Sequence, residues 1–188
     1  MTQTQNVNTL IQALNASDPV LSEDARSALI AQGIDILPML LAHLPTLNPK
    51  QSLKVASILG ALGHPDCQVA LLQLLEHPHP LVKVAVVQAL AHYPSHTVFE
   101  ALLPLLQSPD MMLQIAAVTS LGKLGDQRAV APLAHLLQQT NDSTLRYNCI
   151  RALGNLGDAS VLPLIASFAN DPNHHVRDDV AQAMGKLV

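Results

Sequence analysis

Aromatic residues are nearly absent from this chain of 188 residues: Phe, Trp and Tyr together make up 2%, and there is no Trp. Because hydrophobic residues still make up 49% of the chain, a buried core has to be built mainly from Leu, Ala, Val and Ile. A chain of this length can bury a sizeable core. The composition therefore favours stacked helices.

Cysteine is scarce as well. Cys67 and Cys149 are the two cysteines, and neither has a partner at the C-x-x-C spacing. A disulfide framework and a zinc ribbon are therefore not expected. We expect both thiols to be structural, with Cys149 on a core face, where a thiol behaves as a small hydrophobe. Cys67, near the start of a helix, is expected to be the more accessible of the two.

Charge and long apolar runs are also limited. The net charge is −4, from ten basic and fourteen acidic residues, and no Lys/Arg cluster occurs. Since nucleic-acid binding depends on basic groups that release counterions from phosphates, we expect no nucleic-acid partner. No stretch reaches the ~18 apolar residues of a membrane span, and the first ten residues, MTQTQNVNTL, do not resemble a signal peptide. We expect no membrane span and a cytoplasmic location.

What the chain has instead is an internal repeat. The six letters LGKLGD at 121–126 return as LGNLGD at 153–158. Equivalent leucines or methionines, which serve as an anchor for each repeat, recur every 30 to 32 residues at Leu29, Leu59, Leu90, Leu121, Leu153 and Met184. A position such as −6 is counted from this anchor. A repeat of this length is typical of a helical solenoid.

Helix start and stop residues recur in the same register. Position −11 is occupied by Asp18, Asn48, His79, Asp110, Asp142 and Asn173. Five of these are strong N-cap residues, and a proline follows in the first three repeats, where a missing N–H costs nothing. Position +4 carries Gly33, Gly63, Gly125 and Gly157, which predict helix ends in the left-handed conformation. A further glycine at +1 in four repeats predicts close packing against a neighbouring helix.

Apolar residues between cap and stop lie on one helical face, and a second amphipathic run follows each stop. Each repeat is therefore predicted to be a hairpin of two helices, and we expect six, near residues 6–32, 34–62, 66–93, 97–124, 127–156 and 159–187. One hairpin cannot bury its apolar face alone, but stacked neighbours can. The sequence predicts an all-α fold, an α-α superhelix (HEAT-like solenoid), as a single domain over residues 1–188.

The third repeat departs from this pattern. LAHYP at 90–94 replaces LGxLG, His79 replaces the capping Asp or Asn, and Pro104 lies inside the next apolar run, where it should bend the helix. Two explanations stay open, a strained functional site or drift between ordinary repeats.

Five of the nine histidines gather in the same region, and His77, His79, His92 and His96 are the weak candidates for a metal site. Their spacing matches no metal-binding motif, and Pro94 prevents a helical pairing of His92 with His96. We favour solvated loop histidines and assign no metal. The chain also lacks G-x-S-x-G, P-loop and H-E-x-x-H motifs, so no catalytic residue is assigned.

The candidate partner site is an apolar row at position −6, formed by Leu53, Val84, Ile115 and Tyr147. Leu81 and Met112 at −9 lie close to this row. An exposed apolar strip with polar neighbours marks a partner site. The predicted protein-binding residues are Leu53, Val84, Gln88, Met112, Ile115, Thr119, Tyr147 and Arg151. The alternative is that superhelical twist tucks the apolar row against adjacent helices.

Two segments carry a family resemblance: DMMLQIAAVTSLGKLGDQRAVAPLAHLL and DSTLRYNCIRALGNLGDASVLPLIASF. They resemble the HEAT-like repeats of phycobilin lyases and their relatives. The resemblance implies a solenoid whose second helices line the concave face, and therefore places the apolar row in the groove. This repeat hosts binding scaffolds, lyase subunits and enzymes alike, so it implies the fold more than the activity.

Two functions follow as hypotheses. The first is a non-catalytic scaffold that binds a protein partner and needs no cofactor. The alternative, implied by the resemblance, is a phycobilin lyase subunit or chaperone acting on phycobiliproteins, with a phycobilin as ligand and a heterodimer formed through the C-terminal repeat. Its basic and acidic groups would be Arg146, Arg151, Arg177, Asp178 and Asp179. Deoxyhypusine hydroxylases, related helical-repeat enzymes, hold two irons with pairs of adjacent His and Glu residues. No His is directly followed by Glu in this chain, so we expect no di-iron site.

Overall fold

The computed structural model describes residues 3–187, with side chains from residue 6 onward; residues 1, 2 and 188 lie outside it. Residues 3–187 form twelve α-helices and five short 3₁₀ segments and contain no β-strand. The all-α fold class is therefore confirmed. The chain divides into two compact units, one ending at Tyr93 and the other starting at Pro94. The single domain over residues 1–188 stays a prediction.

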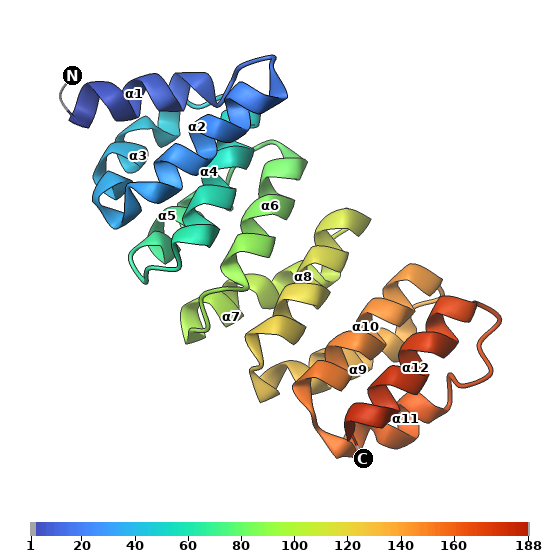
Figure 1. Ribbon diagram of the computed structural model, residues 1–188. Helices are drawn as coiled ribbons and strands as arrows, with labels where there is room; N and C mark the ends of the chain where they lie inside the picture. The colour runs from blue at the N-terminus through green and yellow to red at the C-terminus, as the bar shows by residue number, and fades with distance from the viewer. Residues whose placement is uncertain (1–2, 188) are drawn as a thin grey trace. The chain divides into compact units, whose positions relative to one another are not determined.

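The first unit consists of three helix pairs. Its helices are α1 Gln3–Ala13, α2 Pro19–Ala31, α3 Leu37–His43, α4 Pro49–Leu62, α5 Cys67–Leu74 and α6 Pro80–Leu90, with 3₁₀ segments at Gly33–Ile36 and Leu44–Thr46. The second helices of the pairs, α2, α4 and α6, lie side by side in one layer (Figure 1), and α4 packs against both α2 and α6. Fully buried Leu29, Ile58, Leu71 and Leu90 form part of its core.

The second unit repeats the arrangement. Its helices are α7 His96–Leu102, α8 Met111–Leu124, α9 Val130–Gln139, α10 Ser143–Leu156, α11 Leu162–Ala166 and α12 His174–Leu187, with 3₁₀ segments at Leu103–Gln107, Gln127–Ala129 and Ala159–Val161. Here α10 packs against α8 on one side and α12 on the other (Figure 1). Leu121, Leu133 and Leu153 are fully buried.

Helix boundaries follow the predicted caps. The carboxylate of Asp110 accepts from the N–H groups of Met112 and Leu113, at 2.9 and 3.2 Å. Asp18, Asn48, Asp142 and Asn173 accept equivalent bonds at the starts of their helices. His79 makes no such bond. Each side-chain acceptor satisfies an N–H that the first helical turn leaves unpaired.

Glycines end the second helices and set how closely they pack. Gly63, Gly125 and Gly157 adopt left-handed φ values of 64°, 73° and 76°, as predicted from position +4. Three of the glycines at +1, namely Gly60, Gly122 and Gly154, lie against the alanine at −1 of the following second helix. A Cβ on Gly60 would lie 3.0 Å from Ala89 Cβ, and one on Gly122 would lie 2.7 Å from Ala152 Cβ. The prediction of close packing at +1 is confirmed at these crossings.

The LAHYP departure in the third repeat has a packing explanation. The helix α6 stops at Leu90 without a left-handed residue, and Tyr93 folds inward with an exposed fraction of 5%. Its hydroxyl donates to the backbone oxygen of Leu59, and burial raises the pKa of Tyr93 to about 12. Burial also raises the pKa of the nearby Cys67 thiol. Cys67 and Cys149 are both fully buried, so the prediction that Cys67 is the more accessible of the two was wrong; the Tyr93 hydroxyl lies in hydrogen-bonding contact with the Cys67 thiol.

Two further features bear on the predictions from sequence. The helix α7 ends at Leu102 and continues as the 3₁₀ segment Leu103–Gln107 around Pro104, which confirms a break at that proline. Among the described residues, no single helix has the length and apolar character needed to cross a membrane. One pair, Pro19–Ala31 with Gly33–Thr46, passes only when taken together, and it is bent by 113°.

Candidate functional site

The predicted apolar row is only partly exposed. In the first unit Leu53 is half-buried, and Val84 is 9% exposed, so the prediction of an exposed strip is wrong at Val84. This side chain is tucked among helices, as the alternative reading of the row held. In the second unit Ile115 and Tyr147 are half-buried. Their contact with a partner stays a prediction.

Exposed apolar side chains gather instead in the first turns of the second helices. Of the described side chains, six large hydrophobic ones are exposed: Val20, Leu21, Val69, Leu81, Met111 and Met112. All but Val69 lie in the opening turn of α2, α6 or α8. Met112, a predicted contact, is 57% exposed, and Leu81 is 45% exposed. The first turns therefore carry the apolar surface that the sequence assigned to position −6.

The polar neighbours of the row differ in their surroundings. Gln88 is exposed on α6, in the first unit. In the second unit the hydroxyl of Thr119 donates to the backbone oxygen of Ile115, one turn earlier in α8. The guanidinium of Arg151 donates to the side-chain oxygen of Asn148 and lies 5.8 Å from the centre of the Tyr147 ring.

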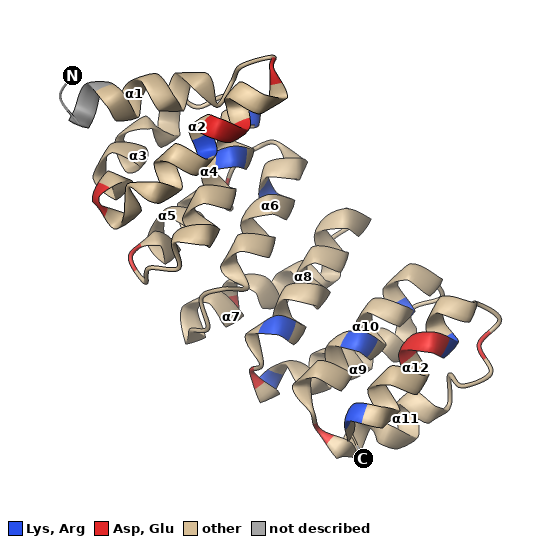
Figure 2. Cartoon of the chain, in the orientation of Figure 1, with Lys and Arg blue, Asp and Glu red and all other residues tan. Residues whose placement is uncertain are grey.

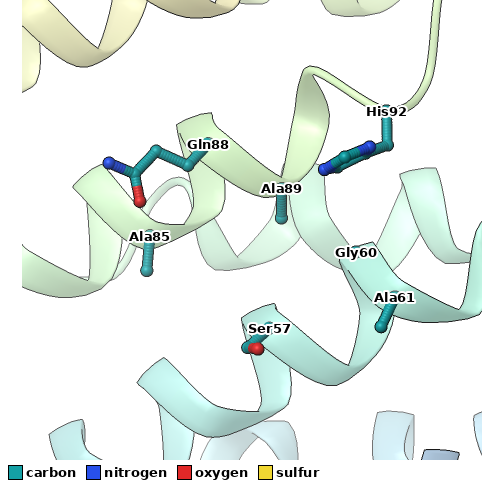
Figure 3. Close-up of a pocket in the computed structure, with 7 residues that line it drawn as sticks. All are labelled: Ser57, Gly60, Ala61, Ala85, Gln88, Ala89 and His92. Atoms are coloured by element: carbon teal, nitrogen blue, oxygen red, sulfur yellow. The ribbon is translucent and has the colours of Figure 1, made fainter.

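A cavity of 470 Å³ opens on the first unit between α4 and α6. It is lined by Ser57, Gly60, Ala61, Ala85, Gln88, Ala89 and His92. Figure 3 shows the alanines of α6 facing α4, with Gln88 and His92 on either side of Ala89. Two predicted candidates, Gln88 as a partner contact and His92 as a weak metal ligand, thus meet at one hollow. Sequence reasoning did not find this cavity, although small residues at three repeat positions are its signal.

A second group of polar side chains lies between α10 and α12. The rings of Tyr147 and His175 are 5.9 Å apart, and Asp179 on α12 is 9% exposed. Burial raises the pKa of the Asp179 carboxyl, and the charge of Arg151 opposes that effect. Among the described residues, none forms a hydrogen bond or ion pair with this carboxylate, and Arg151 acts on it only through its charge. The arrangement combines an aromatic face, a cation and a poorly solvated acid.

The other arginines of the proposed basic group are occupied. Arg146 forms a 2.7 Å ion pair with Asp171, which is buried. Arg177 donates to the backbone oxygens of Asp171 and Pro172, at 2.8 and 3.0 Å. Both side chains therefore hold the loop before α12 in place. Arg151, which is exposed on α10, makes no contact of this kind with the described residues of the loop.

The candidate histidines differ in their surroundings: the Nδ1 atom of His79 is buried and accepts no hydrogen bond from any described residue, whereas His92 is exposed. In the first unit the Nδ1 atom of His77 accepts from the backbone N–H of His79 at 3.0 Å, and burial lowers the pKa of His77. In the second unit His96 lies beside Glu100 and Arg128. Across the described residues, no group of three or more His, Cys, Asp or Glu side chains is arranged to hold a metal ion.

Charged residues are sparse along the chain (Figure 2), and several of them form ion pairs. Glu23 lies 2.6 Å from Arg26 and 3.0 Å from Lys54, and hydrogen bonds from these two cations lower its pKa to about 2. In the second unit Arg128 pairs with Asp126 at 2.6 Å and lies 4.2 Å from the centre of the Phe99 ring. The cations of these groups are largely matched by neighbouring acids.

Comparison with known families agrees with the helical hairpins. The family profile described as HEAT repeats matches residues 68–149 and 137–187. The chain belongs to the HEAT-repeat family. Solved HEAT-like structures align over nearly the whole length of this HEAT-repeat chain. An engineered protein has a TM-score of 0.64 and 19% identity, with 100% of this chain and 99% of that chain covered.

The complex of CpcE and CpcF of phycocyanin lyase from Nostoc sp. PCC7120 has a TM-score of 0.62 at 22% identity, covering 97% of this chain and 65% of that chain. At such identity the likeness concerns the fold. The expected resemblance to HEAT-like repeats of the phycobilin lyases is thus confirmed at the level of fold.

Two curated proteins match shorter segments. Deoxyhypusine hydroxylase of Mus musculus is 35% identical over 68 residues, which are 36% of this chain and 22% of that protein. A phycocyanin operon protein Z of Pseudanabaena tenuis, itself uncharacterised, is 36% identical over 63 residues, or 34% of this chain and 31% of that protein. The matched segments thus span between a fifth and a third of these relatives.

Proposed function

We propose that this HEAT-repeat chain is a non-catalytic scaffold that binds a partner protein through the second helices of each of its two units. The observation that carries the proposal is the position of the exposed apolar side chains: Val20, Leu21, Leu81, Met111 and Met112 all occupy first turns of second helices. Exposed apolar groups that gather in this way are typical of interaction surfaces.

In the first unit the proposed contacts are the exposed Leu81 and Gln88 and the half-buried Leu53, whereas Val84 is 9% exposed and offers little surface. In the second unit the contacts are Met112, Ile115, Thr119, Tyr147 and Arg151. Methionine suits such a surface because its flexible thioether adapts to different partners. Burying one large apolar side chain contributes ~1.5–3 kcal/mol, so a few of these residues can dominate the affinity.

The test is affinity capture from the source cell with Met112→Asp and Leu81→Asp, each of which places a charge in a first turn. The matched control is Val69→Asp, because Val69 is 57% exposed, as Met112 is, but lies on the first helix α5. We expect both variants to lose at least tenfold of the captured partner while the control retains it, with melting temperatures unchanged. Equal capture by all three proteins would refute the scaffold.

A second candidate function is a phycobilin lyase subunit or chaperone that acts on phycobiliproteins. It is supported by the 36% identity to a phycocyanin operon protein and by the fold likeness to phycocyanin lyase. The ligand would be a phycobilin and the partner a second subunit docked at the C-terminal repeat. Arg151 would bind a propionate of the phycobilin, because it is exposed and lies beside the Tyr147 ring.

Absorption spectroscopy tests this second candidate. Phycocyanobilin mixed with the protein should give a shifted, intensified red band, and Arg151→Gln should weaken binding about tenfold, as expected for the loss of a charged hydrogen bond. Lys123→Gln is the control, since Lys123 is an exposed cation on α8. An unchanged spectrum, with or without a candidate second subunit, would leave the scaffold as the better account.

A further inference from the structure

The α4/α6 cavity lies beside a close crossing of the two helices, where the neighbouring side chains are small. Gly60 on α4 lets Ala89 of α6 approach so closely that a Cβ on Gly60 would lie 3.0 Å from Ala89 Cβ. Beside this crossing, Ala61 and Ala85 add little side-chain volume, and a hollow of 470 Å³ remains (Figure 3). The floor of the cavity is therefore made of residues no larger than alanine.

The same glycine–alanine crossing occurs twice in the second unit, where larger residues stand at the equivalent positions. Ser57, Ala61 and Ala85 occupy positions −2 and +2 of α4 and −5 of α6. At the α8/α10 crossing these positions carry Thr119, Lys123 and Asn148, and at the α10/α12 crossing they carry Arg151, Asn155 and Asp179. The hollow is thus a property of one crossing and not of the repeat in general.

Hydrogen-bonding groups stand around the small floor. Gln88 offers both a donor and an acceptor, and the His92 ring offers one or the other at each nitrogen. No other described side chain bonds to the Gln88 carboxamide or to the His92 ring, and both residues are exposed. On α4 the Ser57 hydroxyl oxygen accepts a long bond, 3.4 Å, from Arg26. A group seated on the floor would therefore meet polar partners at its edge.

We infer that this cavity receives the side chain of a tyrosine or tryptophan from the partner protein, and this inference rests on the scaffold function proposed above. A flat aromatic ring suits a floor of Gly60, Ala61, Ala85 and Ala89, which presents Cβ atoms at most. The volume falls within the ~300–1,000 Å³ of ordinary ligand clefts. Aromatic anchors that fill pockets are the residues that most often dominate protein interfaces.

The polar rim selects a ring that carries a hydrogen-bonding group. A buried tyrosine hydroxyl or indole N–H needs a partner, and Ser57, Gln88 and His92 supply one on each side of the cavity. A purely apolar side chain would strip water from these groups and return no bond, which costs affinity. Phenylalanine and leucine are therefore the weaker occupants.

The test uses the protein alone with side-chain analogues as probes. We expect 4-methylphenol and 3-methylindole to shift the amide NMR signals of Gly60, Ala61 and Ala89 in a saturable manner. Toluene should bind about fivefold more weakly, the factor expected for one net hydrogen bond. Absence of shifts at these residues, or toluene binding as well as 4-methylphenol, would overturn the inference.

Blocking variants use residues that the same positions already carry elsewhere in the chain. Ala61→Asn copies Asn155 and Ala85→Asn copies Asn148, so each fills the cavity with a side chain compatible with the repeat. The control is Ala31→Asn, which makes the same change at position +2 of α2, where the side chain is exposed and lines no part of this cavity. Circular dichroism and melting temperature confirm folding of all three.

We expect each blocking variant to weaken probe binding at least tenfold and the control to leave it unchanged. Retained binding in the blocked proteins, or an equal loss in the control, would contradict the assignment. The probes need no partner protein, so the two proposals fail separately. Probe binding with capture insensitive to both Met112→Asp and Leu81→Asp rejects the scaffold alone, whereas capture that these two variants reduce, without probe binding, rejects the cavity alone.

Discussion

Tyr93 stands at position +3, where most other repeats carry a leucine such as Leu62, Leu124 or Leu156. The leucines fill that position by apolar contact only. Tyr93 adds a hydroxyl that donates to the backbone oxygen of Leu59, inside a site that is 5% exposed. This bond links the turn after α6 to α4. The residue that departs from the repeat pattern therefore also anchors the last turn of the first unit to its core.

Removal of that hydroxyl should therefore destabilise the protein. We predict that Tyr93→Phe lowers the free energy of unfolding by ~1–3 kcal/mol, because the Leu59 oxygen loses a buried donor. Tyr147→Phe is the control, since Tyr147 is half-buried and its hydroxyl bonds to no described residue; it should change stability by less than ~0.5 kcal/mol. Urea denaturation of both variants measures the difference. Equal effects would mean that the Tyr93 hydroxyl contributes no net stability.

Asp179 makes the stability of the folded protein depend on pH. Burial raises the pKa of its carboxyl in the folded state, while Arg151, His175 and Lys186 oppose the shift and Asp178 adds to it. A raised folded pKa means that the folded state holds the proton more tightly than the unfolded state. The free energy of unfolding contributed by this group therefore falls as the pH rises above the ordinary Asp value of about 4.

We predict that Asp179→Asn is more stable than the unchanged protein at pH 7 and that the difference shrinks as the pH falls toward about 4, where the carboxyl becomes protonated in the folded and the unfolded state alike. Chemical denaturation across this range measures it. Because His175 also faces Asp179, the comparison is repeated with His175→Gln in both proteins. A variant less stable at pH 7 would show instead that the attraction between the Asp179 carboxylate and the charge of Arg151 outweighs the cost of burying the carboxylate.

At the scale of the helix, the glycines at +1 set the spacing between second helices. Gly122 and Gly154 lie where a Cβ would come within 2.7 and 2.8 Å of the next helix, whereas nothing lies within 4 Å of such an atom on Gly185. The same residue at the same repeat position is thus required for packing in two helices and is not in α12. In α12 it only lowers helix propensity.

Because of this difference, replacing glycine by alanine should change the stability in opposite directions at the two positions. We predict that Gly122→Ala destabilises the protein by ~1–3 kcal/mol through overpacking against Ala152. Gly185→Ala should instead stabilise it by up to ~1 kcal/mol, because alanine is the better helix former and meets no neighbour. Thermal denaturation of the two variants provides the comparison. A stable Gly122→Ala protein would show that α8 and α10 move apart at little cost.

Helix boundaries were predictable because they depend on local chemistry. Asp110 and Gly125 mark the ends of α8 through a side-chain acceptor and a left-handed turn, and both are visible in the sequence. The burial of Val84 and Cys67 was not predictable, because it depends on the angle between helices and on the inward turn of Tyr93. The α4/α6 cavity was not predicted for a related reason. Its floor consists of small side chains that leave space unfilled, and these form no recognisable motif.

At the scale of the whole chain, position −3 changes character between the inner and terminal repeats. It is apolar and fully buried at Ala56, Val87, Val118 and Ile150. In the first repeat it is occupied by Arg26, which is half-buried, and in the last by Ala181, which is exposed. Exposed Arg177 and Asp178 precede Ala181 by one turn in α12. The heterodimer predicted through the C-terminal repeat stays a prediction, and its partner would have to match a face of small and charged residues.

The small side chain at −3 distinguishes the surface of α12 from that of α10. In α10, Ile150 is fully buried and lies one turn before Gly154, the glycine against which Ala183 of α12 packs. In α12 the same two positions hold Ala181 and Gly185, and both are exposed. The helix α12 thus keeps the glycine of a packing surface but lacks the large apolar side chain that accompanies it in α10.

We predict that Ala181→Ile recreates the α10 surface on α12 and makes the protein self-associate, because burying an isoleucine contributes about 2 kcal/mol. Sedimentation velocity should then show an apparent mass that rises with protein concentration. The control is Ala131→Ile, the same change at an exposed alanine of the first helix α9, and it should stay at its original mass. Association of both variants alike would mean that added hydrophobicity, not the Gly185 surface, drives the contact.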